Sequence, residues 1–526
     1  MTQNLFSFLL LITPMHALNR FLAFTLLIFP VTSLPCLNAQ DFVTLRSLQG
    51  VSIRAVIEKV EQGHVVLRRE DGIRFNSPLS LFDLNSRAYL LRERQRLLSL
   101  PRTTSIVPAS PSALESGVSS QKSDSFESSP KEFRALNEII GQPLFVDGSL
   151  WDDDPVAVGT RLRWPRESIT SSQTSYRLYP PSNYRFVGAR PYSAALYGDA
   201  SKVTGLSLVF ANKGDCFAAA GAAEEHFKDG TVTKDPRQLK KWMEHDADLV
   251  AELFENLLGK PRRQNFGQGS AKRKVSRWDW NGHSFLLSVM DGEFVSLSVE
   301  TVASAEARGK TRKTADMYIR RIHRENVDRR PNGDVVIQNL PMVDQGPKGY
   351  CVPATFERCM RYMAIPADMY LLAMAGNTGL GGGTHTPTLV QAVQQEVVSA
   401  GRNFKPLRGH PSLRELARSI DSGVPILWGL HSTKTFNRIA NDRTVDRKGM
   451  DAREWKSLMS KAVKEAGDLA EPGSGDSNHI CIIHGYNKET EEIAFTDSWG
   501  ERYQERWITA AEAAHFSQGR CWVIEY

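Results

Sequence analysis

Residues 101–130 are rich in serine, proline and threonine and contain one aromatic residue, Phe126. Such a segment cannot bury enough apolar surface to offset the entropy lost on ordering, so it is typical of a linker. The whole chain of 526 residues is too long for one compact domain. We therefore expect a disordered linker over residues 96–130, with separate folded units on either side of it.

The composition is that of a globular protein. Hydrophobic residues make up 41% of the chain and charged residues 24%, which excludes a disordered, collagen-like or polytopic membrane protein. A net charge of +6 is too dilute over this length to indicate nucleic-acid binding. Six cysteines are too few for a disulfide-stapled scaffold.

The first 39 residues are typical of an export signal. A mostly apolar run over residues 21–31 follows the positive charge of Arg20. We expect a signal peptide over residues 1–39, cleaved near Ala39, with translation starting at the first methionine or at Met15. The protein would then be secreted or lie in the periplasm or cell envelope, with no stable membrane span after cleavage. An uncleaved anchor is the alternative, although no apolar run here reaches the roughly 18 residues of a span.

Residues 41–95 have the pattern of a small β unit. Alternating residues 51–57, a turn, and the apolar run over residues 64–68 predict a hairpin. The stretch Val-Val-Leu-Arg-Arg-Glu-Asp-Gly and the leucine-rich end resemble the Sla-type homology domain, an SH3-like barrel. The resemblance implies binding to a cell-surface or protein partner, without chemistry. A generic small barrel is the alternative.

Residues 131–325 predict an α+β middle domain of unknown role. A strand is expected around residues 206–210, and leucines at helical spacing predict a helix over residues 239–258. Two type I′ turn signals, Asn-Gly and Asp-Gly, predict a three-stranded meander over residues 278–297. Trp278 could belong to a ligand platform, but an aromatic residue on such a strand more often covers a core.

A candidate nucleophile lies in the last third of the chain. Turns rich in glycine and proline end at Cys351, and an amphipathic stretch over residues 354–363 follows. A thiol at a helix start feels the partial positive charge of unpaired N–H groups, which favours the nucleophilic thiolate. Gln345 lies six residues upstream, where its amide can be brought beside the backbone N–H of Cys351. Two such donors can hold a developing oxyanion.

A base and its orienter follow in two apolar runs near the end of the chain. Residues 478–486 and 493–497 are expected to form adjacent strands joined by a turn. His479 begins the first strand and Asp497 ends the second, so both fall at the same end of the hairpin. A cysteine nucleophile needs such a base, and the base needs an orienting group. His484 is the rival base, but its odd offset turns it to the opposite face.

These residues carry a family resemblance. The order Gln345, Cys351, His479, Asp497, with Asp-Ser-Trp-Gly at the last position, resembles a papain-clan cysteine peptidase. Within that clan the sequence is most similar to the bacteriocin-processing (double-glycine) peptidases and their stand-alone relatives. The resemblance covers about 190 residues, and Gly-Val-Pro-Ile-Leu at 423–427 matches the family's central strand.

The resemblance implies a papain-like domain over residues 335–526 and a role for each site residue. Cys351 would be the nucleophile, and His479 the general base and acid. Asp497 would orient the imidazole, and Gln345 would bind the oxyanion. No metal or organic cofactor is implied, and the sequence contains neither HExxH nor CxxC.

The predicted fold class is thus multi-domain α+β: an SH3-like barrel, an α+β middle domain and a C-terminal papain-like cysteine peptidase domain. The predicted activity is that of an exported cysteine peptidase acting on peptide or protein substrates, with no nucleic-acid partner. Two alternatives stay open: a non-catalytic surface binding protein, and a transglutaminase-like enzyme that transfers amides. An insertion at residues 431–476 is expected to form part of a substrate cleft or lid.

Overall fold

The computed structural model describes most of the chain from residue 130 onward and a few segments before it. The described residues are 43–46, 52–60, 64–69, 74–78, 82, 86, 90, 130–199, 201–218, 235–310, 315–473 and 478–526. The predicted signal peptide and nearly all of the predicted linker lie outside them. The chain divides into two compact units, Met1–Ser112 and Ala113–Tyr526, which are described separately.

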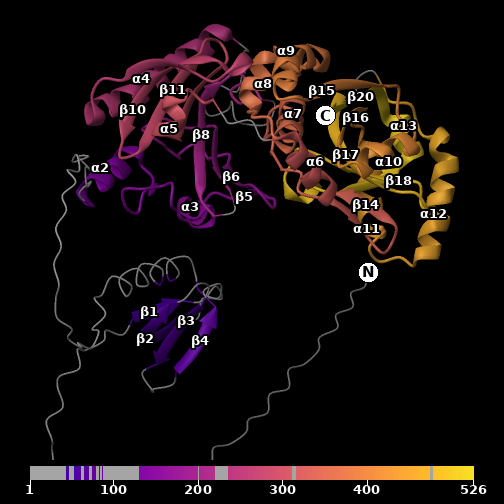
Figure 1. Cartoon of the computed structure of the whole chain (residues 1–526), viewed down its shortest axis with the longest axis horizontal. Helices are drawn as coiled ribbons and strands as arrows, with labels where there is room; N and C mark the ends of the chain where they lie inside the picture. The colour runs from indigo at the N-terminus through magenta and orange to yellow at the C-terminus, as the bar shows by residue number, and fades with distance from the viewer. Residues whose placement is uncertain are drawn as a thin grey trace, which may run out of the picture. The chain divides into compact units, whose positions relative to one another are not determined.

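The first unit contains a four-stranded antiparallel sheet (Figure 1). Its strands pair in sequence order: β1 (Val43–Arg46), β2 (Ser52–Val60), β3 (His64–Arg69) and β4 (Arg74–Pro78). Alternate apolar residues such as Ala55, Val65 and Leu67 form a small buried core. The strands agree with the predicted β unit, and its closure as an SH3-like barrel stays a prediction.

The first sheet of the second unit is an eight-stranded antiparallel sheet. In spatial order its strands are β5 (Arg166–Ile169), β6 (Thr174–Leu178), β7 (Ser193–Gly198), β8 (Val203–Asn212), β12 (Phe294–Thr301), β11 (His283–Met290), β10 (Arg273–Trp280) and β9 (Arg262–Phe266). The expected strand at 206–210 and the expected meander are both present. The β10–β11 turn has positive φ at Asn281 and Gly282, as a type I′ turn requires.

Helix α4 (Pro236–Leu258) packs on this sheet. The Asp235 side chain caps its N-terminus and Pro236 occupies the first turn, both of which favour helix initiation. Phe254 stacks on Trp278, so this tryptophan covers the core rather than a ligand platform. Shorter helices of this region are α2 (Pro130–Ile140), α3 (Pro155–Leu162), α5 (Val302–Glu306), α6 (Asp316–Glu325) and the 3-10 turn η2 (Gly269–Ala271).

The second sheet of this unit has the order β13-β14-β17-β16-β20-β15, and β18 and β19 extend from β17. The strands are β13 (Val327–Arg329), β14 (Asp334–Ile337), β15 (Asn403–Arg408), β16 (Ile426–His431), β17 (Asn478–Asn487), β18 (Glu492–Thr496), β19 (Arg506–Thr509) and β20 (Ser517–Glu525). The central strand expected at residues 423–427 begins only at Ile426. The residues before it still form a turn, in which Gly423 has positive φ.

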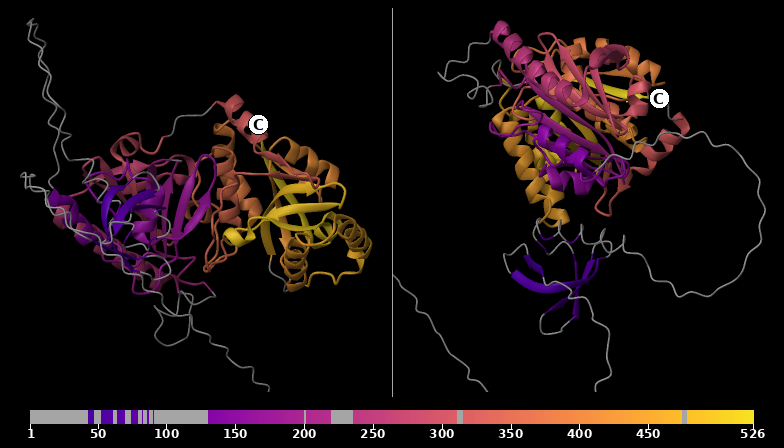
Figure 2. Two further views of the ribbon diagram at one scale, coloured as in Figure 1. Left: turned by 90° about the horizontal axis from the view of Figure 1, so that it is seen from below. Right: turned by 90° about the vertical axis from the view of Figure 1, so that its left-hand side faces the viewer.

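Helices surround this sheet and link it to the first one. They are α7 (Cys351–Tyr362), α8 (Met369–Ala375), α9 (Thr386–Ser399), α10 (Leu413–Asp421), α11 (Lys434–Asp446), α12 (Ala452–Glu465) and α13 (Ala510–Phe516), with 3-10 turns η3 (Ala466–Asp468) and η4 (Glu501–Tyr503). Helices α7 and α8 lie between the two sheets (Figure 2). There Ala354 and Tyr370 share a buried cluster with Val209 and Phe294 of the first sheet. Within the described residues, no helix is long and apolar enough to cross a membrane.

Candidate active site

Cys351 is the first residue of α7. The helix begins three residues earlier than the amphipathic pattern predicts, because Pro353 is tolerated in a first turn, where its missing N–H has no intrahelical acceptor. The thiol is free and only partly buried. The positive end of the α7 dipole therefore lies at a residue that is not fully buried.

His479 and Asp497 meet at one end of the β17–β18 hairpin. Their Nε2 and Oδ1 atoms are 2.9 Å apart, and the two side chains are 5% and 0% exposed. Arg506 donates from Nη1 to the other carboxylate oxygen at 2.7 Å. Burial opposes ionisation of Asp497, but His479 and Arg506 outweigh it and lower the pKa of this carboxyl to about 2. The carboxylate is therefore ionised at neutral pH.

The Cys351 thiol lies near enough to the His479 ring to influence its pKa, so the thiol, the imidazole and the carboxylate lie next to one another. Burial disfavours a charged ring, but the hydrogen bond to the ionised Asp497 carboxylate raises the pKa of His479 above its ordinary value. Nε2 is bonded to Asp497, which leaves Nδ1 as the ring nitrogen able to exchange a proton with sulfur. Trp499 stacks on the ring at 4.6 Å between centroids and holds its plane.

Both the backbone and the side chain of Gln345 make hydrogen bonds that hold it near Asp497. Its N–H donates to the Ser498 carbonyl at 2.9 Å, one residue after Asp497. Its Nε2 donates to the Lys348 carbonyl at 3.0 Å. The Gln345 amide is therefore fixed by the Lys348 carbonyl, and its place beside the backbone N–H of Cys351 stays a prediction. Oε1 is buried without a hydrogen-bond partner among the described residues.

The comparisons with known proteins give one family match. Residues 337–524 match the Peptidase_C39 like family. The chain carries a C39-like peptidase domain. The matched family is of the cysteine-peptidase type, and all four predicted site residues lie inside the matched region. A comparison with curated proteins finds no match.

Two further residues touch Asp497 within the C39-like domain. Cys481 donates from sulfur to Asp497 Oδ1 at 2.9 Å, as expected for a residue two positions after His479 on a strand. Burial raises the pKa of the Cys481 thiol to about 12, so it stays protonated. Arg506 was not predicted, since it lies on a separate strand and its only local signal is a charge within a buried run. The rival base His484 faces away and bonds the Ile337 carbonyl.

The ligand atoms of His479, Cys481 and Asp497 lie within 4.8 Å of one another, a spacing that a metal ion could in principle use. The cationic Arg506 already occupies the second oxygen of Asp497. A cation at this place would meet that charge at close range, so the residues fit a proton-transfer chain better than a metal centre.

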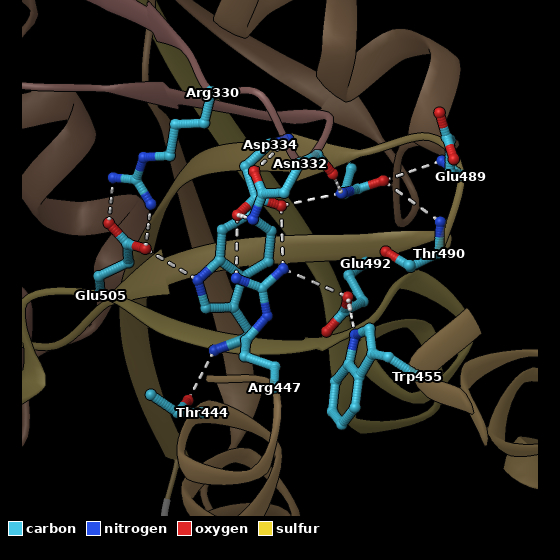
Figure 3. Close-up of polar contacts among 12 residues, drawn as sticks. Arg330, Asn332, Asp334, Thr444, Arg447, Trp455, Glu489, Thr490, Glu492 and Glu505 are labelled. Atoms are coloured by element: carbon cyan, nitrogen blue, oxygen red, sulfur yellow. Dashed lines mark hydrogen bonds and ion pairs between the residues drawn. The ribbon is translucent and has the colours of Figure 1, made fainter. Parts of the chain in front are cut away.

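The insertion at residues 431–476 contacts groups at both ends of the β17–β18 hairpin. Asn437 of α11 accepts from Arg506 through Oδ1 at 3.1 Å, behind Asp497. Beyond α11, Arg447 makes two hydrogen bonds to Asp334, and Trp455 donates to Glu492 (Figure 3).

Arg330 and Glu505 add a further bidentate pair to this group. We call Arg330, Asp334, Arg447, Trp455, Glu492 and Glu505 the turn-end network, because Glu492 pairs with Asn487 at the hairpin turn. Trp455 of α12 therefore lies at the end of the hairpin away from His479, whereas Asn437 of α11 lies behind the site. A cleft or lid role for the insertion stays a prediction.

Proposed function

We propose that this protein is an exported cysteine peptidase that hydrolyses peptide or amide bonds through an acyl-enzyme on Cys351. The observation that carries the proposal is the buried hydrogen bond between His479 and an ionised Asp497, next to the Cys351 thiol at the start of α7. These are the parts that nucleophilic catalysis by a thiol requires: a nucleophile, a base and an orienter. The C39-like match over residues 337–524 supports the same reaction class.

In the proposed reaction, His479 takes the thiol proton and the Cys351 sulfur attacks the carbonyl carbon of the scissile bond. His479 then gives that proton to the leaving amine as the C–N bond breaks. A water molecule, deprotonated by His479, attacks the thioester and releases the acid, which restores the thiol. Asp497 keeps Nε2–H bonded throughout, so the ring stays oriented and its positive form is stabilised.

Gln345 and the backbone N–H of Cys351 are the proposed oxyanion donors. A side-chain amide carries two hydrogens on nitrogen, and the Lys348 carbonyl takes one of them. The second hydrogen is then available for the oxygen of the tetrahedral intermediate. Removing one oxyanion donor typically lowers kcat by roughly 10²- to 10³-fold.

The test compares Cys351→Ala with Cys359→Ala on the same helix. Cys359 is a matched control, because it is fully buried and burial raises its pKa to about 12. We expect Cys351→Ala to lose roughly 10⁴-fold or more of the hydrolysis of dye-labelled casein or of a Gly-Gly-aminomethylcoumarin peptide. It should also lose the fastest iodoacetamide-labelled site in a peptide map, whereas Cys359→Ala should keep both.

Retained hydrolysis in Cys351→Ala would refute the assignment. Labelling of Cys351 without turnover of either probe would favour the non-catalytic binding protein. An amine added to the reaction separates hydrolysis from amide transfer: incorporation of the amine into the product would indicate the transglutaminase-like alternative.

A further inference from the structure

The segment that carries Gln345 is held by the first sheet of the unit at its upstream end. The backbone N–H of Asp344 donates to Glu167 of β5 at 2.9 Å. The Tyr179 hydroxyl, just after β6, donates to the Asp344 carbonyl. The residue before Gln345 is therefore positioned by groups outside the C39-like match.

A buried ion pair holds the downstream end of the same segment. Lys348, three residues before Cys351, contacts Asp215 through Nζ and Oδ1 at 3.1 Å, and the two side chains are 0% and 1% exposed. The other carboxylate oxygen accepts from the Tyr370 hydroxyl at 3.0 Å. The ammonium also lies over the rings of Tyr179 and Tyr370, at 4.6 and 5.1 Å. A charge without water needs such partners, so Asp215 determines where Lys348 can lie.

Backbone hydrogen bonds extend the same connection. Lys213 accepts from Gly381, Gly381 accepts from Gly349, and Gly349 accepts from Gly383, at 2.9, 3.0 and 3.0 Å. Gly382 has φ +129, and a Cβ there would lie 2.3 Å from the Gly349 Cα. The loop at residues 379–383 therefore connects the turn after β8 by backbone hydrogen bonds to Gly349, two residues before Cys351.

From these contacts we infer that Asp215 is a positioning residue for the proposed reaction. It fixes Lys348, whose carbonyl in turn holds the Gln345 amide, so the first sheet forms part of the oxyanion site. The inference rests on the proposed function and deepens it: the C39-like domain needs the turn at residues 212–216 to place its oxyanion donor. Asp215 acts through Lys348 and has no contact with the reacting atoms in this scheme.

The experiment compares Asp215→Asn with Asp334→Asn in the full chain. Asp334 is a matched control: it is 1% exposed and paired with Arg447 in the turn-end network, at the far end of the hairpin from His479 (Figure 3). Both variants break a buried ion pair, so both should lower Tm. At a temperature well below both Tm values, Asp215→Asn should lower kcat for the cleaved probe by at least roughly 10-fold, as expected for a misplaced oxyanion donor, with KM changed less than about 3-fold. Asp334→Asn should keep kcat within about 2-fold.

Two readouts separate positioning from general damage. The iodoacetamide labelling rate of Cys351 should be close to wild type in Asp215→Asn, because the His479–Asp497 pair is untouched. Tyr370→Phe removes a hydrogen bond to Asp215 without removing a charge, and it should lower kcat by a smaller factor, roughly 2- to 5-fold. If Asp215→Asn does not fold, Tyr370→Phe decides, and wild-type kcat in that folded variant overturns the inference.

Equal kcat values for Asp215→Asn, Asp334→Asn and wild type would also overturn it. That result, together with a loss of turnover in Cys351→Ala, would leave the proposed function standing and reject only the role of Asp215. If wild type cleaves neither casein nor the Gly-Gly peptide, the proposed function fails and the inference fails with it.

Discussion

The two ends of the β17–β18 hairpin each bury a carboxylate beside an arginine, yet they differ in what else is present. At one end Asp497 pairs with Arg506 and also accepts from His479 and Cys481. At the other end the acids of the turn-end network, including Glu492, are enclosed by arginine and tryptophan side chains (Figure 3). Among the described residues, only the first end has an imidazole on its carboxylate with the thiol of the partly buried Cys351 beside the ring.

The comparison teaches that a buried ion pair does not by itself mark a catalytic site. Burial raises the pKa of Glu505, in the turn-end network, but the hydrogen bonds from Arg330 outweigh it and lower this pKa to about 2, the same value as for Asp497. What distinguishes the proposed catalytic end, at Asp497, is a group that can exchange a proton with a nucleophile. The four predictions that follow test this difference.

The largest effect is expected from His479→Gln, with His484→Gln on the same strand as its control. Both rings are buried, but burial lowers the pKa of His484 to about 4 and it bonds a backbone carbonyl on the opposite face. We expect His479→Gln to lower kcat by roughly 10³-fold or more, since no other base contacts the thiol in the proposed chain. His484→Gln should change kcat less than about 3-fold. The reverse pattern in steady-state assays would assign the base to His484.

The second-largest loss of kcat is expected from Asp497→Asn, with Glu492→Gln as its control. The first variant keeps the shape of the side chain but loses the charge that orients His479 and stabilises its protonated form, so kcat should fall by roughly 10²- to 10⁴-fold. Glu492→Gln weakens the contacts of Arg447 and Trp455, and should cost about 1–3 kcal/mol of unfolding free energy. Its kcat, measured under folded conditions, should stay within about 2-fold. A comparable loss of kcat in both variants would remove the distinction between the two ends.

A third prediction concerns stability in acid, where the two ends should behave alike. The pKa of Asp497 is lower in the folded protein than its ordinary value of 3.8, so the unfolded chain binds protons first as the pH falls. The resulting stabilisation is present above about pH 4 and is lost as the pH falls towards 2. For Asp497 it amounts to about 2 kcal/mol. Urea unfolding of Asp497→Asn between pH 7 and pH 2 should therefore show a shallower loss of stability than wild type.

Glu505→Gln should flatten the same acid dependence without lowering kcat, since the pKa of Glu505 is shifted in the same direction. An unchanged pH dependence in both variants would mean that other carboxyl groups control unfolding in acid.

The smallest effect is expected for Cys481→Ala. Its thiol donates to Asp497 but stays protonated, because burial raises its pKa to about 12. Removing it leaves the bonds of Asp497 to His479 and Arg506, so kcat should fall by no more than about 5-fold. Iodoacetamide labelling of Cys351 should continue at close to the wild-type rate. A loss as large as that of Cys351→Ala would give Cys481 a direct part in the chemistry.

Local patterns in the sequence predicted the elements that carry the site. The hairpin turn signal and period-two alternation placed His479 and Cys481 on one face and His484 on the other, as observed. The turn-rich segment before Cys351 predicted a helix start, which lies at that residue. These features depend only on neighbouring residues and on backbone geometry, so a single sequence contains them.

Only the tertiary structure decided the contacts between distant segments. Asp215 and Lys348 are 133 residues apart, and Arg506 reaches Asp497 from a separate strand. Neither contact has a periodic signal. The first depends on how the two sheets pack and the second on the pairing of β18 with β19, and both depend on which buried charges must be paired. The residues that surround Gln345 are therefore set by long-range burial, which no local pattern in the chain expresses.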